Sequence, residues 1–203
     1  MNKKEDMETK GFDGNATYAY PNGNHYDGDF LNDLPNGKGV MRFPNHDKYE
    51  GDWVEGEMTG KGEYLFYDKK RDKLIWKYEG WFKNSLFHGL GKMTYPDRTV
   101  YFGEWTEGKR NGYGQQMYAS GDILSGIWDR DTIIYGTYLF ADGSKYVGHF
   151  KDFCFSGYGT FCLLDGTILQ GDWKGNKLEI GAEYKPNGKI CKIENNQKVI
   201  YDY

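Results

Sequence analysis

One five-residue motif, Tyr-x-Gly-x-Trp/Phe, recurs along the chain at a nearly constant spacing. The strict copies are Tyr26–Phe30, Tyr49–Trp53, Tyr78–Phe82, Tyr101–Trp105 and Tyr146–Phe150, and Leu replaces Tyr in Leu124–Trp128 and Leu169–Trp173. Successive copies begin 22 or 23 residues apart, except for a step of 29 between Tyr49 and Tyr78. A fixed period of this size is the signature of a repeat protein, in which each unit packs on its neighbours. The sequence therefore predicts one array of repeats.

Each copy has a second half built around Gly-x-Gly, which in the strict copies begins nine residues after the glycine of the first motif. Glycines and aromatic residues occupy alternate positions in both halves, as in Tyr49-Glu-Gly-Asp-Trp53 and Gly60-Lys-Gly-Glu-Tyr64. Such alternation is typical of β-strands with one apolar and one solvated face. Turn dipeptides such as Asn22-Gly23 separate the runs. We therefore predict an all-β fold, an elongated single-layer antiparallel sheet of about seven to eight stacked β-hairpins.

Glycine in the interior of a strand normally weakens that strand. Its return on the aromatic face has two explanations, and the sequence leaves both open. The missing Cβ makes room for a ring from a neighbouring strand, or the glycine marks a bend in the sheet. Either explanation predicts a sheet that is packed by its own Tyr, Trp and Phe side chains.

The combined pattern Tyr-x-Gly-x-Trp-x-x-Gly-x-x-x-Gly-x-Gly resembles the MORN repeat (membrane occupation and recognition nexus). Residues 49–62 and 101–114 carry this pattern in full. The resemblance covers about residues 12–190, and it implies a twisted, single-layer sheet of stacked hairpins. It does not imply one activity, because relatives of this kind occur in axonemal radial-spoke heads, membrane junctions, lipid kinases and protist cytoskeletal scaffolds.

We divide the chain into a charged N-terminal tail (residues 1–11), a repeat array (12–190) and a C-terminal capping hairpin or strand (191–203). The array opens with a half repeat, residues 12–25. Full repeats then start near residues 26, 49, 78, 101, 124, 146 and 169. The final part departs from the repeat, with an expected turn near Asn195-Asn196, and is predicted to cap the end of the array.

Composition and spacing argue against catalysis and against cofactor binding. The three cysteines and four histidines lack the close spacing of metal ligands. The run Gly103–Arg110 approaches a phosphate-binding loop, but Arg110 stands where that loop needs Ser or Thr. The formal net charge of −4 is unlike that of a nucleic-acid binder. We expect a protein that is not an enzyme, with no catalytic residues, no metal and no cofactor.

The aromatic–glycine face is the first candidate site. Its rings hold the sheet together, but Tyr and Trp are also enriched at interface hot spots, and a long apolar strip often marks a contact site. We expect most rings to pack within the sheet and part of the face to contact a partner. The predicted partner-binding residues are Tyr26, Phe30, Tyr49, Trp53, Tyr78, Phe82, Tyr101, Trp105, Trp128, Tyr146, Phe150 and Trp173.

The second candidate is a basic loop that accounts for the long step between Tyr49 and Tyr78. It comprises Lys69, Lys70, Arg71, Lys73, Trp76 and Lys77. A projecting basic loop beside apolar residues suits an acidic partner or a lipid headgroup. The alternative is a solvated hairpin turn whose apolar residues only lengthen the strands.

We expect a non-catalytic scaffold or interaction module of the cytoskeleton, in a ciliary or axonemal assembly of the cytoplasm. Its expected partners are axonemal or cortical proteins, with self-association as a further option. Frequent Lys, Asn, Asp and Tyr with only five alanines suits an AT-rich protist genome, many of which belong to ciliated cells. The alternative function is a peripheral membrane tether that binds anionic lipid through residues 69–77, which the net charge of −4 disfavours.

Overall fold

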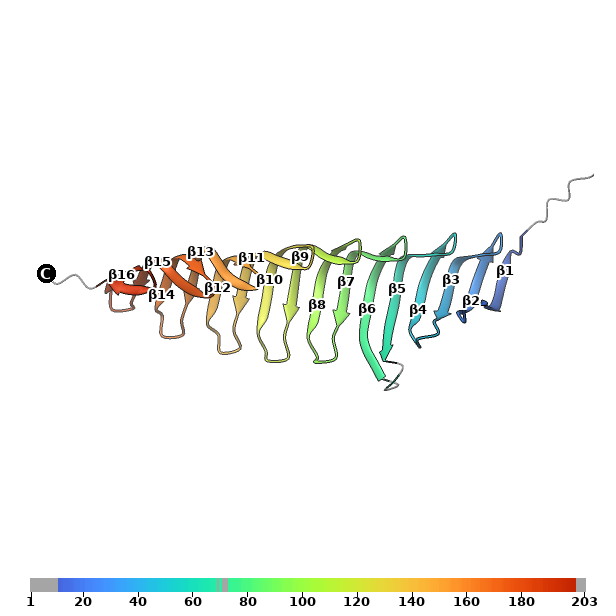
Figure 1. The fold of residues 1–203 in the computed structure, drawn as a ribbon, viewed down its shortest axis with the longest axis horizontal. Coiled ribbons are helices and arrows are strands. Elements are labelled where there is room, and N and C mark those ends of the chain that lie inside the picture. The colour runs from blue at the N-terminus through green and yellow to red at the C-terminus, as the bar shows by residue number, and fades with distance from the viewer. Residues whose placement is uncertain (1–10, 69, 71–72, 200–203) are drawn as a thin grey trace, which may run out of the picture. The chain divides into compact units, whose positions relative to one another are not determined.

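The computed structural model describes residues 11–68, 70 and 73–199. The chain divides into two compact units, Met1–Phe87 and His88–Tyr203. Within each unit, strands that follow one another in the sequence pair antiparallel, as Figure 1 shows. The predicted all-β fold of stacked β-hairpins is therefore confirmed.

The first unit contains six complete strands, each hydrogen-bonded to the next. They are β1 (Gly14–Ala19), β2 (His25–Leu31), β3 (Leu34–Arg42), β4 (Lys48–Val54), β5 (Glu57–Asp68) and β6 (Lys73–Lys83). The strands β5 and β6 are the longest, with 12 and 11 residues. Their pairing extends to Asp68 opposite Lys73. The extra residues between Tyr49 and Tyr78 therefore lengthen this hairpin.

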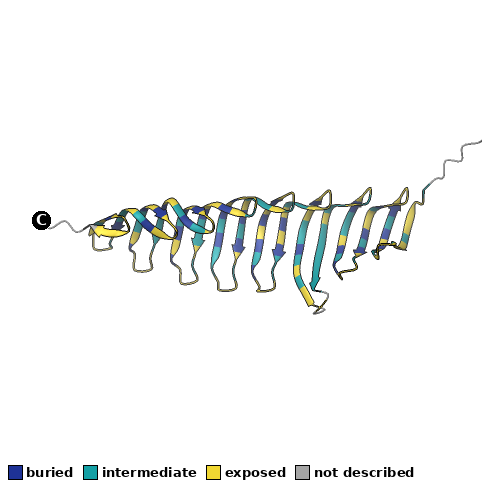
Figure 2. Cartoon of the chain, viewed as in Figure 1, coloured by how far each residue is buried: buried dark blue, intermediate teal, exposed yellow. Residues whose placement is uncertain are grey.

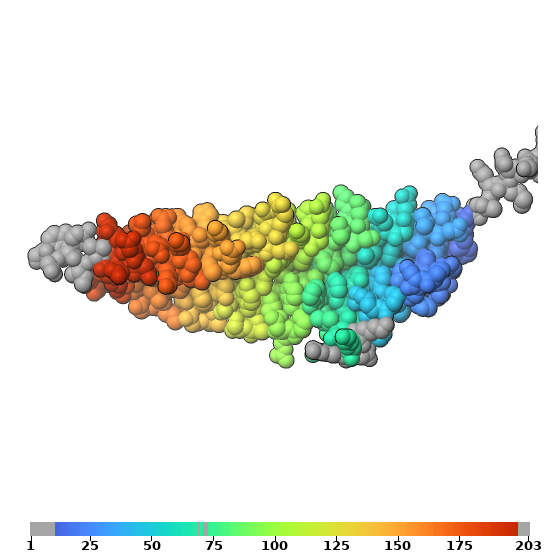
Figure 3. Space-filling model, viewed as in Figure 1, coloured from blue at the N-terminus to red at the C-terminus, as the bar shows by residue number. Residues whose placement is uncertain are grey.

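The second unit takes up most of β7 (Leu86–Thr94) and continues with ten further strands. These are β8 (Val100–Thr106), β9 (Lys109–Met117), β10 (Ile123–Asp129), β11 (Thr132–Leu139), β12 (Lys145–Lys151), β13 (Cys154–Cys162), β14 (Ile168–Lys174), β15 (Lys177–Tyr184), β16 (Ile190–Glu194) and β17 (Gln197–Val199). From β7 to β17, each strand pairs with the next. The space-filling view shows the same local order, with the colour changing steadily along each unit (Figure 3).

In the copies that begin at Tyr26, Tyr49, Tyr101 and Tyr146, glycines inside the strands lie under tyrosine rings. A Cβ at Gly39 would overlap the hydroxyl and ring of Tyr26, and a Cβ at Gly114 would overlap those of Tyr101 in the same way. The ring thus covers a glycine of the neighbouring strand, which confirms the first explanation, room for a ring. In the hairpins that begin with Tyr26, Tyr49, Tyr101 and Tyr146, a bulge directly after the first glycine, as between Gly28 and Phe30, accompanies this contact.

The two copies with Leu in place of Tyr show a further constraint on glycine. A Cβ at Gly136 would collide with the backbone carbonyl of Ser125, and one at Gly181 would collide with that of Gln170. Here the two backbones approach too closely for any side chain. The same close approach occurs in a strict copy, where a Cβ at Gly28 would collide with the carbonyl of Lys38. The second explanation, a bend in the sheet, stays a prediction.

The hairpins turn in two ways. At one end, tight turns place two residues at positive φ, as at Asp152 (50°) and Phe153 (60°), which is the geometry of a type I′ turn. At the other end, wider turns are closed by the side chain of an Asp, Asn or Ser, as where the Ser144 N–H donates to Asp142 Oδ1 at 2.8 Å. Burial alternates along the strands between these two ends (Figure 2).

Candidate interaction surface

The aromatic residues predicted to bind a partner lie inside the protein's own packing. Tyr26, Tyr49, Tyr78, Tyr101 and Tyr146 are fully buried. The others are at most 7% exposed: Phe30, Trp53, Phe82, Trp105, Trp128, Phe150 and Trp173. Their first role is thus to hold the sheet, and contact of these rings with a partner stays a prediction.

We call these twelve buried aromatic residues the ring ladder, and each tyrosine hydroxyl and tryptophan N–H among them donates to an acceptor within the protein. The tyrosine hydroxyl donates to the carbonyl three residues later, as from Tyr49 to Asp52 at 3.0 Å. The tryptophan Nε1–H donates to a glycine carbonyl fourteen residues earlier, as from Trp53 to Gly39 at 3.1 Å. The same bonds recur in later copies, from Tyr146 to His149 and from Trp173 to Gly159. Buried hydroxyl and indole groups need such partners, so the ladder is internally complete.

Ring contacts join neighbouring hairpins. The Tyr26 ring meets Trp53 of the next copy edge-on, with ring centroids 5.3 Å apart, and the Tyr101 ring meets Trp128 at 5.4 Å. Burial favours the neutral phenol, and it raises the pKa of Tyr26 and of Tyr146 to about 12. These tyrosines are structural groups that stay protonated at neutral pH.

The predicted basic loop is only partly described. Lys69 and Arg71 lie outside the described residues, whereas Lys70, Lys73, Trp76 and Lys77 lie within them. The Lys77 ammonium lies 2.5 Å from Glu63 and 3.1 Å from Glu79. The Trp76 ring is 43% exposed and contacts Phe66 at 5.3 Å between ring centroids. Lys77 is therefore paired across the strands and belongs to the sheet surface.

Arg110 is a structural residue whose role the sequence did not reveal. Its guanidinium lies over the Trp128 ring at 4.4 Å and over the Tyr101 ring at 5.5 Å. It donates to the Asp131 carboxylate at 3.1 Å, to the Asp131 carbonyl at 2.9 Å and to Gln116 Oε1 at 2.8 Å. The equivalent position in other copies is apolar, as with Phe155, which stacks on Tyr146. The near-match to a phosphate loop is thus explained by packing on strands β8 and β9.

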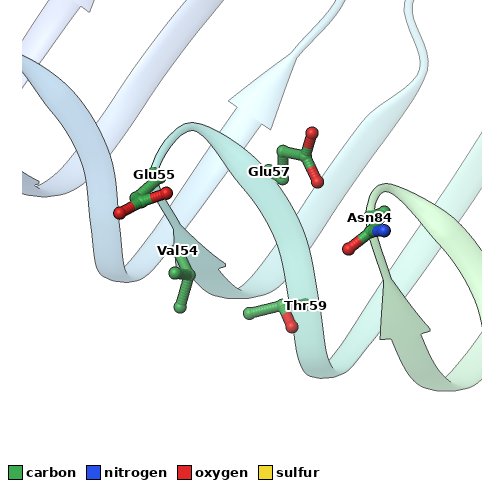
Figure 4. A pocket seen from close by; sticks show the side chains of 5 residues that line it. All are labelled: Val54, Glu55, Glu57, Thr59 and Asn84. Atoms are coloured by element: carbon green, nitrogen blue, oxygen red, sulfur yellow. The ribbon is translucent and has the colours of Figure 1, made fainter.

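The hollows of the surface are open and differ in lining, the first below being polar and the second mostly apolar. One, of about 340 Å³, is lined by Val54, Glu55, Glu57, Thr59 and Asn84, which come from the β4–β5 hairpin and from the turn after β6 (Figure 4). Another, of about 480 Å³, lies beside Arg110 and Gln116. Among the described residues, no group of three His, Cys, Asp or Glu side chains is arranged to hold a metal ion.

Curated relatives share part of this sequence. Alsin from Homo sapiens is 28% identical over 123 residues, and alsin from Rattus norvegicus is 30% identical over the same length. The match covers 58% of this chain but only 6% of alsin.

Two solved structures also align with most of this chain. One is the TCP domain of Drosophila melanogaster SAS-4 (dCPAP), solved with a proline-rich motif of Ana2 (dSTIL), at 14% identity, 88% coverage of both chains and a TM-score of 0.46. The other is the TCP10 domain of Danio rerio CPAP, solved with a peptide of STIL, at 15% identity, 94% coverage of both chains and a TM-score of 0.34.

No helix that is long and apolar enough to cross a membrane occurs in the part of the chain that the structure describes. The MORN repeat matches residues 9–25, 26–48, 49–71, 78–100, 101–123 and 135–145, which together make up more than half of the sequence. MORN repeats fit a module of protein interaction or membrane association. The tyrosine–glycine ladder is the structural counterpart of this sequence match, and the chain belongs to the MORN-repeat family.

Proposed function

We propose that this chain is a non-catalytic scaffold of the cytoskeleton, in a ciliary or axonemal assembly, which holds segments of partner proteins at fixed spacing. The observation that carries the proposal is the recurrence of one internally satisfied ring ladder in successive hairpins. Because the ring side chains and their donors are used within the sheet, the repeat supplies a firm frame. The residues between them are free to differ and to select partners.

The test is fractionation of the tagged native protein, with extraction first by mild detergent and then by high salt. The scaffold function predicts that the protein stays in the detergent-insoluble fraction with axonemal or cortical proteins, which mass spectrometry identifies. Release by detergent alone, together with membrane proteins, contradicts it.

Such a release supports the membrane tether instead. In that case the change of Lys70 and Lys73 to Glu abolishes binding to anionic vesicles. Pairing of Lys77 with Glu63 and Glu79 weighs against the tether, since it cancels positive charge at the base of the loop.

A further inference from the structure

The face opposite the rings differs between the two units. We call it the outer face. In the first unit, charged side chains occupy most positions of the outer face. The strand pairing places these residues there: Asp27, Asp29, Lys38, Arg42, Lys48, Glu50, Asp52, Lys61, Glu63, Lys77 and Glu79. Several of them pair across strands, as Lys38 does with Asp52. A surface of paired charges is well solvated and offers no apolar contact.

Strands β9–β13 of the second unit present a very different outer face. Strand pairing places three outward residues of each strand in three rows that cross the strands. We call these fifteen residues the outer patch: Tyr113, Gln115, Met117, Ile123, Ser125, Ile127, Tyr135, Thr137, Leu139, Lys145, Val147, His149, Tyr158, Thr160 and Cys162. Of these described residues, Lys145 alone is counted as charged at pH 7.

One row of the outer patch is strongly exposed. Tyr113 pairs with Ile127, and Ile127 pairs with Tyr135. These residues are 58%, 44% and 46% exposed. The row continues through His149, whose ring meets that of Tyr135 at 5.0 Å, to Tyr158, which is 57% exposed. Exposed tyrosines and aliphatic residues in an unbroken row are typical of an interface and are rare on a solvated surface.

An acidic edge runs along one side of the outer patch. The wider turns before β12 and β14 contain Asp142 and Asp165, and residues 140–144 and 163–167 include no Lys or Arg. In the turn before β10, the Asp122 carboxylate instead accepts a hydrogen bond from the Tyr138 hydroxyl at 2.9 Å, on the ring side of the sheet. Hydrogen bonds hold the other two carboxylates in place, from Ser144 N–H to Asp142 and from Thr167 N–H to Asp165, both at 2.8 Å. Successive turns are two strands apart, which corresponds to about 10 Å.

The dimensions and charges favour one kind of occupant. Five strands and five residues of strand length give an area of roughly 400 Å². A stable dimer buries about 800 Å² on each partner, so stacking of two outer patches falls short. A helix of about 16 residues is as long as the patch is wide. Its heptad spacing of about 10.5 Å also matches the spacing of the acidic turns. An anionic membrane would be repelled by the same aspartates.

We propose that the outer patch binds an amphipathic helix of a partner protein, whose apolar side covers Tyr113, Ile127, Tyr135 and Tyr158 and whose Lys or Arg residues, one per heptad along one flank, face Asp142 and Asp165. The proposal rests on the scaffold function and names the class of its partner. The helix comes from another chain, because the described residues of this one contain strands and turns but no helix.

The probe is a labelled 18-residue helical peptide, with leucines on one side and a lysine on one flank of each heptad. Fluorescence anisotropy measures its binding to the full chain. We expect Tyr135→Glu to weaken binding at least tenfold, since it places a charge in the exposed row. The matched control is Trp81→Glu, because Trp81 is also 46% exposed but lies on the charged outer face of the first unit. Its affinity is expected to stay unchanged.

Charge is tested separately. Asp142→Asn and Asp165→Asn keep an oxygen that accepts from the turn N–H groups, so the fold is retained. Together they are expected to weaken binding of the peptide several-fold and to reduce the salt dependence of that binding. A second peptide with Glu in place of Lys is expected to bind at least tenfold more weakly. Thermal melting confirms that each variant is folded.

Four results would overturn the proposal. The first is no binding of the lysine peptide at 100 μM. The second is binding of the glutamate peptide as tight as that of the lysine peptide, and the third is binding by Tyr135→Glu as tight as that by the unchanged protein. The fourth is loss of self-association in sedimentation, or of vesicle binding in flotation, caused by Tyr135→Glu. The last result would assign the outer patch to a second copy or to a membrane. If Tyr135→Glu leaves the protein in the detergent-insoluble fraction with the same partners, the outer patch is not the binding site for those partners, and the scaffold function is unaffected.

Discussion

The tyrosine–glycine contact makes a quantitative prediction about the stability of the array, for which Gly114→Ala is the most informative change. The new Cβ would lie 2.5 Å from Cζ and 2.7 Å from Cε2 of Tyr101. Ordinary carbon contacts need about 3.5 Å, so the ring must retreat by about 1 Å. Trp105 and Trp128, with ring centroids at 5.3 Å and 5.4 Å, oppose this movement. Overpacking costs about 1–3 kcal/mol, and we take the upper end because the ring is held on both sides. Loss of the hydrogen bond from Tyr101 to Glu104 adds about 1 kcal/mol, so the free energy of unfolding is expected to fall by about 3–4 kcal/mol.

The assay is urea unfolding followed by circular dichroism, with thermal melting as a second measure. For a chain of this length, about 3–4 kcal/mol corresponds to a fall in Tm of roughly 6–15 °C. A double-mutant cycle with Tyr101→Leu tests the cause, since Leu124 and Leu169 occupy the same place in two other copies. Removal of the ring frees the space for the methyl group. The double variant is therefore expected to be about 2 kcal/mol more stable than the sum of the single changes implies.

The reasoning is refuted if the two changes are additive within about 0.5 kcal/mol. Gly175→Ala is a contrasting variant, because its φ is positive at 54° and nothing lies within 4 Å of a new Cβ, whereas Gly114 is not at positive φ. It reports the cost of a left-handed backbone alone, about 1–2 kcal/mol, which Gly114→Ala does not carry.

Substitutions at three further positions and a change of pH test other parts of the structure. Trp105→Ala is expected to lower the free energy of unfolding by about 3–5 kcal/mol in urea titrations, because a buried ring is lost, and an unchanged midpoint would contradict the packing. Gly112→Val is expected to impair folding, as judged by the soluble yield and the melting curve, because Gly112 has φ +81° and a new Cβ would lie 2.7 Å from Glu104 Oε2. Arg110→Met is expected to retain more stability than Arg110→Ala, since a flexible apolar chain still covers Trp128, and equal melting temperatures would count against that role. As pH rises from 10 towards 12, the urea midpoint is expected to fall, because the raised pKa of Tyr26 and of Tyr146 stabilises the fold below pH 10 and that contribution is lost through about pH 12; a constant midpoint would rule this out.

Repetition made the fold accessible from the sequence. A single Tyr-x-Gly-x-Trp motif says little, but its return in register with alternating parity requires strands that repeat the same contacts. The ring over glycine follows from the same parity, because Tyr49 and Gly51 point to one side of a strand. The sequence did not reveal how completely the rings would be covered. Alternation shows which residues share a face, but burial depends on the bulge that carries Tyr49 over Gly62 of the next strand.

The sequence analysis also missed the outer patch, because its residues come together only through the register of the paired strands. Tyr113 and Ile127 are 14 positions apart in the sequence and meet only through strand pairing. A signal for it does exist in the variable positions of the motif. These are Asp27 and Asp29 in the first copy but Ser125 and Ile127 in the fifth, so the outer face loses its charge along the chain. Arg110 left a weaker signal, as a charged residue at a position where Met58 and Phe155 stand in other copies.

The two faces of the sheet have different roles, and this determines which substitutions can separate folding from partner binding. On the ring face, each Tyr hydroxyl and Trp indole of the ladder donates to a carbonyl of the same sheet, as Trp105 does to Gly91 at 3.3 Å. A change there removes an internal bond as well as any partner contact, so loss of binding and loss of folding occur together. Outer-face side chains such as Tyr135 and Trp81 are nearly half exposed, and their replacement costs the fold little. Selectivity for a partner can therefore differ from copy to copy on the outer face while the ring ladder stays the same, and only outer-face variants can separate recognition from stability.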